Sequence, residues 1–213
     1  MYEQIVKDTA QMVAMWQCYG FCHGVLNTDN MSILGLTLDY GPFMMMEHYD
    51  PDLICNHTDL SIGRYTFIRQ PQMCKWNLKK LAQALHPFVN LENSLKVLKQ
   101  NFDKEFEECY YERMGQKLGF LLTEAFTQEQ TSGVRKQIIN KTAHRDLTIK
   151  ELECIKQLFD TMKETKADFT DTFRILAQVR TSSKCGCTNN LGEIASAIAK
   201  ECAPIHIIED RQN

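Results

Sequence analysis

The chain has 213 residues, of which 44% are hydrophobic and 24% charged, a composition typical of a globular domain and not of a disordered or fibrous protein. Its formal net charge of −3 and the lack of a long basic run argue against nucleic acid or an anionic membrane as a partner. No apolar stretch reaches the length of a membrane span. Nine scattered cysteines, an odd number, indicate reduced thiols in a reducing compartment and no disulfide framework.

The first predicted element is a helix from about Glu3 to Phe21. Apolar side chains recur there at spacings of three and four, which gives one buried stripe. Gly20 and Gly24 are expected to end the helix. The stripe consists of Ile5, Thr9, Met12, Val13 and Trp16.

Loop and short strand are predicted for residues 23–40. The apolar run at 33–36 is too short and too apolar for an exposed strand, so we expect a buried β-hairpin beneath a cleft. Residues 41–71 follow as a long irregular segment, and a loop of that length is usually functional. Within it, Arg64 is expected to contact a phosphate or to tether the loop to a carboxylate. Residues 44–46, three methionines, are either apolar filler or a patch that binds a partner.

From Cys74 onward the pattern is helical. Trp76 is expected in the core, and Asp146 is expected to cap a helix that begins directly after it. The triplet formed by His144, Arg145 and Asp146 spells the kinase catalytic motif, but its position before an amphipathic helix favours a helix start. The expected helical segments are 74–85, 102–110, 147–162, 167–179 and 191–202, with a turn-rich stretch at 182–190.

The candidate catalytic residues lie within residues 23–43. Asp29 and Asn30 supply a base and an amide oxygen from one loop, and Asp39 supplies a second carboxylate ten residues after Asp29. A nucleotide-dependent transfer needs a carboxylate near the attacking hydroxyl and oxygen ligands that hold Mg²⁺ on the phosphates. The expected hairpin would bring Asn30 and Asp39 close enough to share one ion. In isolation, both the Asp-Asn pair and the Asp-x-Gly are also common in simple turns.

Residues 23–43, HGVLNTDNMSILGLTLDYGPF, closely resemble the signature of the selenoprotein O family. Shorter matches to the same family are Tyr49-Asp50-Pro51, ICNH at 54–57, GRY at 63–65, QP at 70–71, CKWNL at 74–78, ADFT at 167–170 and TFR at 172–174. Members of this family have a protein-kinase-like fold and transfer AMP from ATP to Ser, Thr or Tyr hydroxyls of proteins.

The resemblance implies a mainly α protein (α+β overall), the C-terminal lobe of a kinase-like fold with a short β-hairpin at the active-site cleft. Carried over by position, Asp29 resembles the catalytic base, and Asn30 and Asp39 resemble the ligands of Mg²⁺ or Mn²⁺. Arg64 is our candidate for binding the co-substrate ATP. The expected partners are ATP and hydroxyl-bearing protein substrates, and eukaryotic members of the family suggest a mitochondrial location.

The resemblance covers residues 1–180, and we expect residues 181–213 to form a divergent, turn-rich segment with a terminal helix. Family members carry a Gly-rich, Lys-bearing N-terminal lobe that this sequence does not contain. We therefore expect an incomplete form of a protein adenylyltransferase, whose activity alone is open. The alternatives are a catalytically inactive interaction module and an ordinary protein phosphotransferase. Cys185 and Cys187 are interpreted as exposed turn thiols, with zinc or redox roles as the alternatives.

Overall fold

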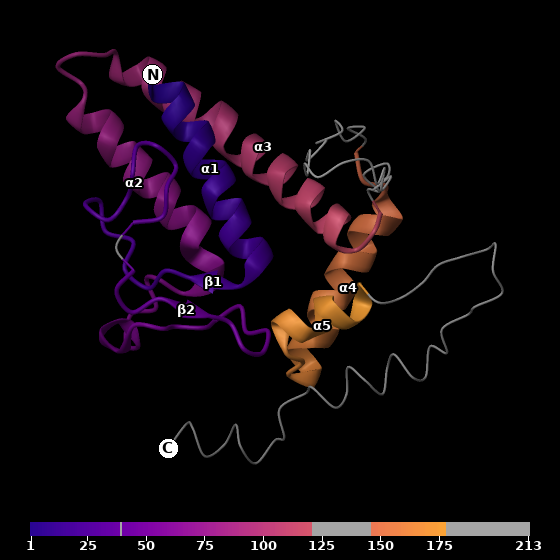
Figure 1. Cartoon of the computed structure of the whole chain (residues 1–213). Helices are drawn as coiled ribbons and strands as arrows, with labels where there is room; N and C mark the ends of the chain where they lie inside the picture. The colour runs from indigo at the N-terminus through magenta and orange to yellow at the C-terminus, as the bar shows by residue number, and fades with distance from the viewer. Residues whose placement is uncertain (39, 121–145, 178–213) are drawn as a thin grey trace, which may run out of the picture.

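The computed structural model describes residues 1–38, 40–120 and 146–177 of the chain. Within these residues the protein is mainly helical, as predicted, and its one sheet consists of two short antiparallel strands (Figure 1). Three helices lie side by side, and two more pack together near the C-terminal end of the third. In chain order they are α1 (Tyr2–Tyr19), α2 (Gln70–Ala84), α3 (Leu91–Lys117), α4 (Ile149–Thr165) and α5 (Phe169–Leu176). None of the helices in this described part is long and apolar enough to cross a membrane.

Helix α1 confirms the predicted stripe, because all five of its predicted members are buried. The helix ends one residue before Gly20, which adopts the left-handed conformation with φ 71°. In that conformation the Gly20 N–H donates to the carbonyl of Trp16, and a glycine accepts this geometry without the strain that a Cβ would add. The sequence signal for the end of the helix is therefore correct.

Two hydrophobic clusters form the core. The first lies between α1, α2 and α3 and includes Val13, Leu78 and Phe102. The second joins α4 and α5 to the end of α3 and to the segment after β2, and it includes Met114 and Phe169. Burial of large side chains of this kind contributes roughly 1.5–3 kcal/mol each.

Helix α2 turns a different face to the core from the one expected for Trp76. The indole is 41% exposed. Cys74 and Leu78 are buried, and Trp76 is two residues from each, which places it on the opposite side of a helix with 3.6 residues per turn. The prediction of a core tryptophan is wrong for this reason. The helix also begins four residues before the expected start, with Pro71 in its first turn.

The expected buried hairpin is wrong. Residues 31–38 contain no strand, and the side chains of Ile33, Leu34 and Leu36 are exposed. The segment lies against α1 instead, where the indole N–H of Trp16 donates to Thr37 Oγ1 at 2.9 Å. Four apolar residues are too few to bury both faces of a hairpin unless other elements cover it. The observed strands flank this segment: β1 (Phe21–Cys22) pairs with β2 (Met44–Met45).

The segment from β2 to α2 is irregular, as expected, apart from two single-turn 3₁₀ helices, η1 (His57–Asp59) and η2 (Phe67–Arg69). It is fastened to the start of α5. The Phe169 N–H donates to the carbonyl of Glu47 at 2.6 Å, and the Tyr49 N–H donates to the carbonyl of Ala167 at 3.1 Å. The second hydrophobic cluster therefore reaches Met46, the residue that directly follows β2.

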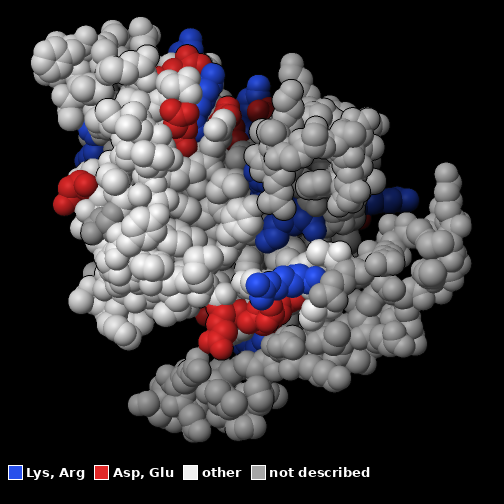
Figure 2. Space-filling view, viewed as in Figure 1, with Lys and Arg blue, Asp and Glu red and all other residues white. Residues whose placement is uncertain are grey.

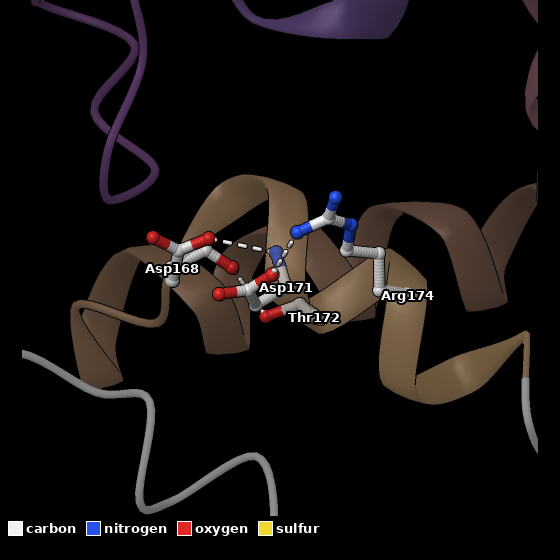
Figure 3. Close-up of polar contacts among 4 residues, drawn as sticks. All are labelled: Asp168, Asp171, Thr172 and Arg174. Carbon is white, nitrogen blue, oxygen red and sulfur yellow. Dashed lines mark hydrogen bonds and ion pairs between the residues drawn. The ribbon is translucent and has the colours of Figure 1, made fainter.

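Both C-terminal helices begin with side-chain caps. Thr148, and not Asp146, caps α4, because its hydroxyl and the Glu151 carboxylate bond reciprocally to the first turn. Asp168 caps α5 by accepting the Asp171 N–H at 2.7 Å (Figure 3). Figure 3 also shows Arg174 bonded to the Asp171 carboxylate at 3.1 Å. The predictions for His144, Arg145, Cys185, Cys187 and residues 178–213 lie outside the described residues.

Candidate active site

The two strands close the segment that carries the candidate catalytic residues. Phe21 pairs with Met45 and Cys22 pairs with Met44, so the chain enters and leaves residues 23–43 at adjacent points. The N–H of Met46 extends this closure by donating to the carbonyl of Gly20 at 2.8 Å. A loop whose ends are fixed by backbone hydrogen bonds loses much of its conformational freedom. The sheet therefore positions the whole segment.

His23 is buried at the start of this loop and fixes its far end. Its Nδ1 accepts the Val25 N–H at 3.3 Å, so the proton belongs on Nε2, which donates to the carbonyl of Leu38 at 2.7 Å. The backbone N–H of His23 donates to Gln70 Oε1 at 2.8 Å. His23 thus holds the residue directly before Asp39. Asp39 itself lies outside the described residues.

The residue after Asp39 is also held. The ring of Tyr40 packs against Phe43, with centroids 5.3 Å apart, and against Phe21, with centroids 6.1 Å apart. Phe43 in turn stacks on Phe21 at 5.8 Å. Aromatic pairs at these separations contribute about 0.5–1.5 kcal/mol each beyond their buried area. The residue before Asp39 is therefore held by His23, directly after β1, and the residue after Asp39 is held by Phe21 of β1.

Two buried amide side chains of α2 bond to backbone carbonyls at the start of the loop. Gln70 Nε2 donates to the carbonyl of Phe21 at 2.9 Å, and Asn77 Nδ2 donates to the carbonyl of Leu26 at 2.9 Å. They stand seven residues apart and hence on one face of α2. Neither residue stands out as a candidate from the sequence alone. The available signal was a polar amide at a helix position that faces the core, because a buried amide needs hydrogen-bond partners.

Gly24 lies against the irregular segment that precedes η1. A Cβ on Gly24 would lie 2.6 Å from the Sγ atom of Cys55, and Asn56 Nδ2 donates to the Gly24 carbonyl at 3.2 Å. The Cys55 thiol also lies 3.5 Å from that of Cys22. This thiol contact and burial raise the pKa of Cys22, so it stays a neutral thiol. The close approach requires a glycine at position 24.

Asp29 and Asn30 present oxygen atoms that the protein does not use. Asp29 is exposed, and its carboxylate has no hydrogen bond or ion pair within the described residues. Asn30 donates its amide to the carbonyl of Val25 at 3.1 Å, and its backbone N–H donates to the carbonyl of Asn27 at 3.1 Å. Both contacts use donors of Asn30, and its Oδ1 accepts no hydrogen bond within the described residues. The loop is thus built to present a carboxylate and an amide oxygen.

Divalent cations such as Mg²⁺ prefer oxygen ligands of these two kinds. No group of three or more His, Cys, Asp or Glu side chains that could hold a metal occurs in residues 1–38, 40–120 and 146–177. The donor chemistry of Asp29 and Asn30 nevertheless fits a hard cation. A complete site needs at least one further ligand, and Asp39 is the candidate by sequence.

The guanidinium of Arg64 contacts aromatic rings and forms no ion pair with a carboxylate in the described part of the chain. Its guanidinium lies 4.7 Å from the ring centroid of Trp76 and 5.6 Å from that of Tyr65. Its backbone N–H donates to a carboxylate oxygen of Asp59 at 3.0 Å. The hydroxyl of Tyr65 donates to Asn27 Oδ1, which connects this region to the loop that carries Asp29.

A small pocket of about 80 Å³ lies beside the same loop, between α1 and α2. Thr28 and Ser32, which flank Asp29 and Asn30, form one wall, and Asn77 forms part of another. Asn77 Oδ1 is the one buried side-chain oxygen or nitrogen without a hydrogen-bond partner in the described part of the chain. An unused hydrogen-bond acceptor thus belongs to one of the residues that line the pocket.

Comparisons with a family model and with curated proteins agree with each other. The family model described as protein adenylyltransferase SelO matches residues 1–202. The mitochondrial protein adenylyltransferase SelO of Mus musculus is 43% identical over 204 residues, which are 96% of this chain and 26% of that protein. The Homo sapiens protein of the same name is 40% identical over the same share. The mitochondrial SelO-1 of Danio rerio is 44% identical over 178 residues, 84% of this chain and 22% of its own length. The chain thus spans about a quarter of the length of these curated relatives.

Proposed function

The chain belongs to the family of the protein adenylyltransferase SelO, and from this premise we propose that it carries the base and metal-ligand part of an AMP-transfer site. The relatives are named protein adenylyltransferases, and the matched residues include the whole loop at 23–43. We propose a kinase-like C-terminal lobe as its fold, since the mainly helical body, with one small sheet at the candidate site, is compatible with such a lobe.

Asp29 is the proposed base. In AMP transfer, a hydroxyl oxygen of the acceptor protein attacks the α-phosphorus of ATP, a new P–O bond forms, and the bond to the leaving pyrophosphate breaks. Asp29 would accept the proton of the attacking hydroxyl, because its carboxylate is exposed and has no partner within the described residues. A carboxylate already bound in an ion pair would be a weaker base.

Asn30 and Asp39 are the proposed ligands of Mg²⁺ or Mn²⁺. A divalent cation held by their oxygens would supply positive charge between the α-phosphate and the leaving pyrophosphate. The contribution of the chain is positional. His23 holds Leu38 on one side of Asp39, Tyr40 packs on the other side, and the Asn30 amide is fixed by Val25.

We propose that further parts of the relatives' longer chains bind the phosphates of ATP that the metal ion and its ligands do not contact. Arg64 is the candidate for a phosphate contact in this chain, and since its guanidinium has no ion pair within the described residues, it is equally available to a carboxylate of the acceptor protein. Protein side chains with Ser, Thr or Tyr hydroxyls are the proposed acceptors. The relatives are named mitochondrial, and we propose the same location for this protein.

One observation carries the proposal: a loop with the family signature is closed by β1 and β2 and presents an unpaired carboxylate and an amide oxygen. The test joins this chain to the N-terminal lobe expected from the family and supplies Mg²⁺ with ATP labelled on either the α- or the γ-phosphate. AMP transfer predicts label on protein from α-labelled ATP only. Asp39→Ala and Asp29→Asn should each lower this labelling by about 100-fold or more, a loss typical for removal of a catalytic base or charge partner.

Label from the γ-phosphate would identify an ordinary phosphotransferase instead. No labelling by a well-folded protein would favour an inactive interaction module. Normal labelling by Asp39→Ala would refute the metal-ligand assignment.

A further inference from the structure

The segment from the end of η1 through α2 has an unusual charge distribution. Residues 60–91 contain five Lys or Arg residues and no Asp or Glu, although the whole chain has a net charge of −3. Of these five cations, Lys75 is neutralised by Asp103 of α3 at 2.5 Å. The others are Arg64, Arg69, Lys79 and Lys80. These four form no ion pair within the described residues, so the segment carries a net positive charge there.

Three of the residues in this segment form one cluster. The Arg64 guanidinium lies 4.7 Å from the ring centroid of Trp76, and Lys80 Nζ lies 5.0 Å from the same centroid. Trp76 and Lys80 are one helical turn apart and share a face of α2. We call Arg64, Trp76 and Lys80 the cationic–aromatic surface. No ion pair of Arg64 or Lys80 with a carboxylate occurs within residues 1–38, 40–120 and 146–177.

The cluster has the physical properties of an anion-binding surface. Each cation is attracted to the face of the indole, which holds both side chains in place. Neither cation has a carboxylate partner within the described residues, so a carboxylate of a bound peptide would be attracted to both. A guanidinium bonds a carboxylate through two parallel N–H groups, while an ammonium acts as a compact point charge. The indole adds a flat apolar surface against which a peptide can pack.

The cationic–aromatic surface is linked to the proposed catalytic loop. Tyr65, the neighbour of Arg64, donates its hydroxyl hydrogen to Asn27 Oδ1, two residues before Asp29. Trp76 is followed directly by Asn77, which bonds to the carbonyl of Leu26 at 2.9 Å. The residues that follow Arg64 and Trp76 in sequence are therefore bonded to the segment that leads to Asp29.

We propose that Arg64, Trp76 and Lys80 bind an acidic segment of the acceptor protein, close in sequence to the hydroxyl that is modified. The naming of this partner as an acceptor rests on the proposed AMP transfer. The positive charge of the segment, the exposed indole of Trp76 and the lack of ion pairs at Arg64 and Lys80 within the described residues do not depend on that proposed function. The surface would select acceptors whose Asp or Glu residues lie near the modified Ser, Thr or Tyr.

The test measures peptide binding without ATP, by fluorescence anisotropy with the 213-residue chain. A labelled peptide carries one tyrosine flanked by several glutamates, and a matched peptide carries glutamines in their place. We expect about three- to tenfold tighter binding of the acidic peptide, a preference that falls as salt is raised. Lys80→Glu and Trp76→Ala should each remove most of the preference.

Lys156→Glu is the matched control, because Lys156 is an exposed residue of α4 and its reversal changes the net charge by the same amount. It should leave the preference intact. Circular dichroism of each variant checks that the helices are retained, which is expected because both Trp76 and Lys80 are exposed.

Equal binding of the two peptides would overturn the proposal. An equal loss in Lys80→Glu and Lys156→Glu would also overturn it, because the effect would then belong to net charge alone. Displacement of the peptide by Mg²⁺-ATP would reassign the surface to the nucleotide. The binding measurement does not depend on AMP transfer. A preference for the acidic peptide, together with an absence of labelling in the AMP-transfer test, would therefore support the cationic–aromatic surface and refute only the proposed function.

Discussion

Two glycines of this chain share a left-handed backbone but have different surroundings. Gly24 has φ 82°, and a Cβ there would lie 2.6 Å from Cys55 Sγ. Gly119, after α3, has φ 74°, and apart from its chain neighbours no atom of the described residues lies within 4 Å of the same position. A left-handed backbone costs a residue with a Cβ roughly 1–2 kcal/mol. The pair therefore separates the conformational cost from the steric cost.

We predict that Gly24→Ala lowers the free energy of unfolding by about 1–3 kcal/mol more than Gly119→Ala, because only Gly24 adds an overlap with a buried side chain. Urea denaturation of the two variants and the parent protein measures this difference. Equal losses would show that Cys55 moves aside without cost and that the loop tolerates displacement at this point.

The site residues that could be predicted from the sequence are those defined by chemical type. Asp29 and Asn30 stand out as a carboxylate next to an amide, and the structure leaves oxygens of both unused. His23, Gln70 and Asn77 could not be assigned in the same way. Their role is to bond backbone groups of the loop, in the case of the two α2 amides across 47 to 51 residues of chain, and no local spacing encodes such pairs.

Among the elements, the helices were predictable and the hairpin was not. Helices α1 and α4 follow from apolar residues at spacings of three and four, which is a local property. The burial of residues 33–36 depends on what lies opposite them, and this is not a local property. The face of α2 was misjudged at Trp76 because a large aromatic side chain is usually, but not always, a core residue. Here two cations contact the indole, and it stays 41% exposed.

Lys117, the last residue of α3, connects three helices. Its Nζ donates to the carbonyl of Cys18 near the end of α1 at 2.6 Å and lies 3.5 Å from the ring centroid of Phe173 in α5. No carboxylate pairs with it within the described residues. Burial lowers the pKa of Lys117 to about 8, because a charged amine is poorly solvated there, while the nearby Cys18 acts weakly in the opposite direction.

This shift predicts a pH-dependent contribution to stability. Between about pH 8 and the usual lysine pKa of 10.5, the unfolded chain keeps a proton on Lys117 that the folded chain has lost. The unfolded state then binds more protons, so the contribution of Lys117 to stability rises with pH across this window. We expect a gain on the order of 1 kcal/mol, reduced by the solvent that still reaches the amine.

The measurement compares the parent protein with Lys117→Met by urea denaturation at pH 7.5 and pH 9.5. Buried Cys18 and Tyr110, whose pKa values are raised, give the opposite slope in both proteins and largely cancel in the difference. The parent should gain stability relative to Lys117→Met as the pH rises. Lys104→Met, an exposed position on α3, should show no such change. A constant difference between the parent and Lys117→Met would contradict the burial argument.

At the scale of the whole molecule, charge and apolar surface are unevenly distributed. The lower left of Figure 2, where the irregular segment between α1 and α2 lies in Figure 1, shows a broad area without Lys, Arg, Asp or Glu. Exposed apolar side chains gather in this part of the chain: Ile33, Leu34, Leu36, Leu38, Tyr40, Phe43, Met44 and Met45. Three of these residues, Ile33, Leu34 and Leu36, were expected in the core from the sequence, since apolar character alone does not distinguish a core from an apolar surface.

Two leucines of the same loop test this description of the molecule. Leu26 is fully buried, whereas Leu34 is 68% exposed. We expect Leu26→Ala to lower the free energy of unfolding by about 2–5 kcal/mol, because it leaves a cavity in the core between α1 and α2. Leu34→Ala should change it by less than about 0.5 kcal/mol, as surface substitutions usually do. Urea denaturation of both variants decides between the two arrangements. If residues 33–36 formed a buried hairpin, the two variants would lose similar amounts of stability. Similar losses would therefore contradict the exposed position of Leu34.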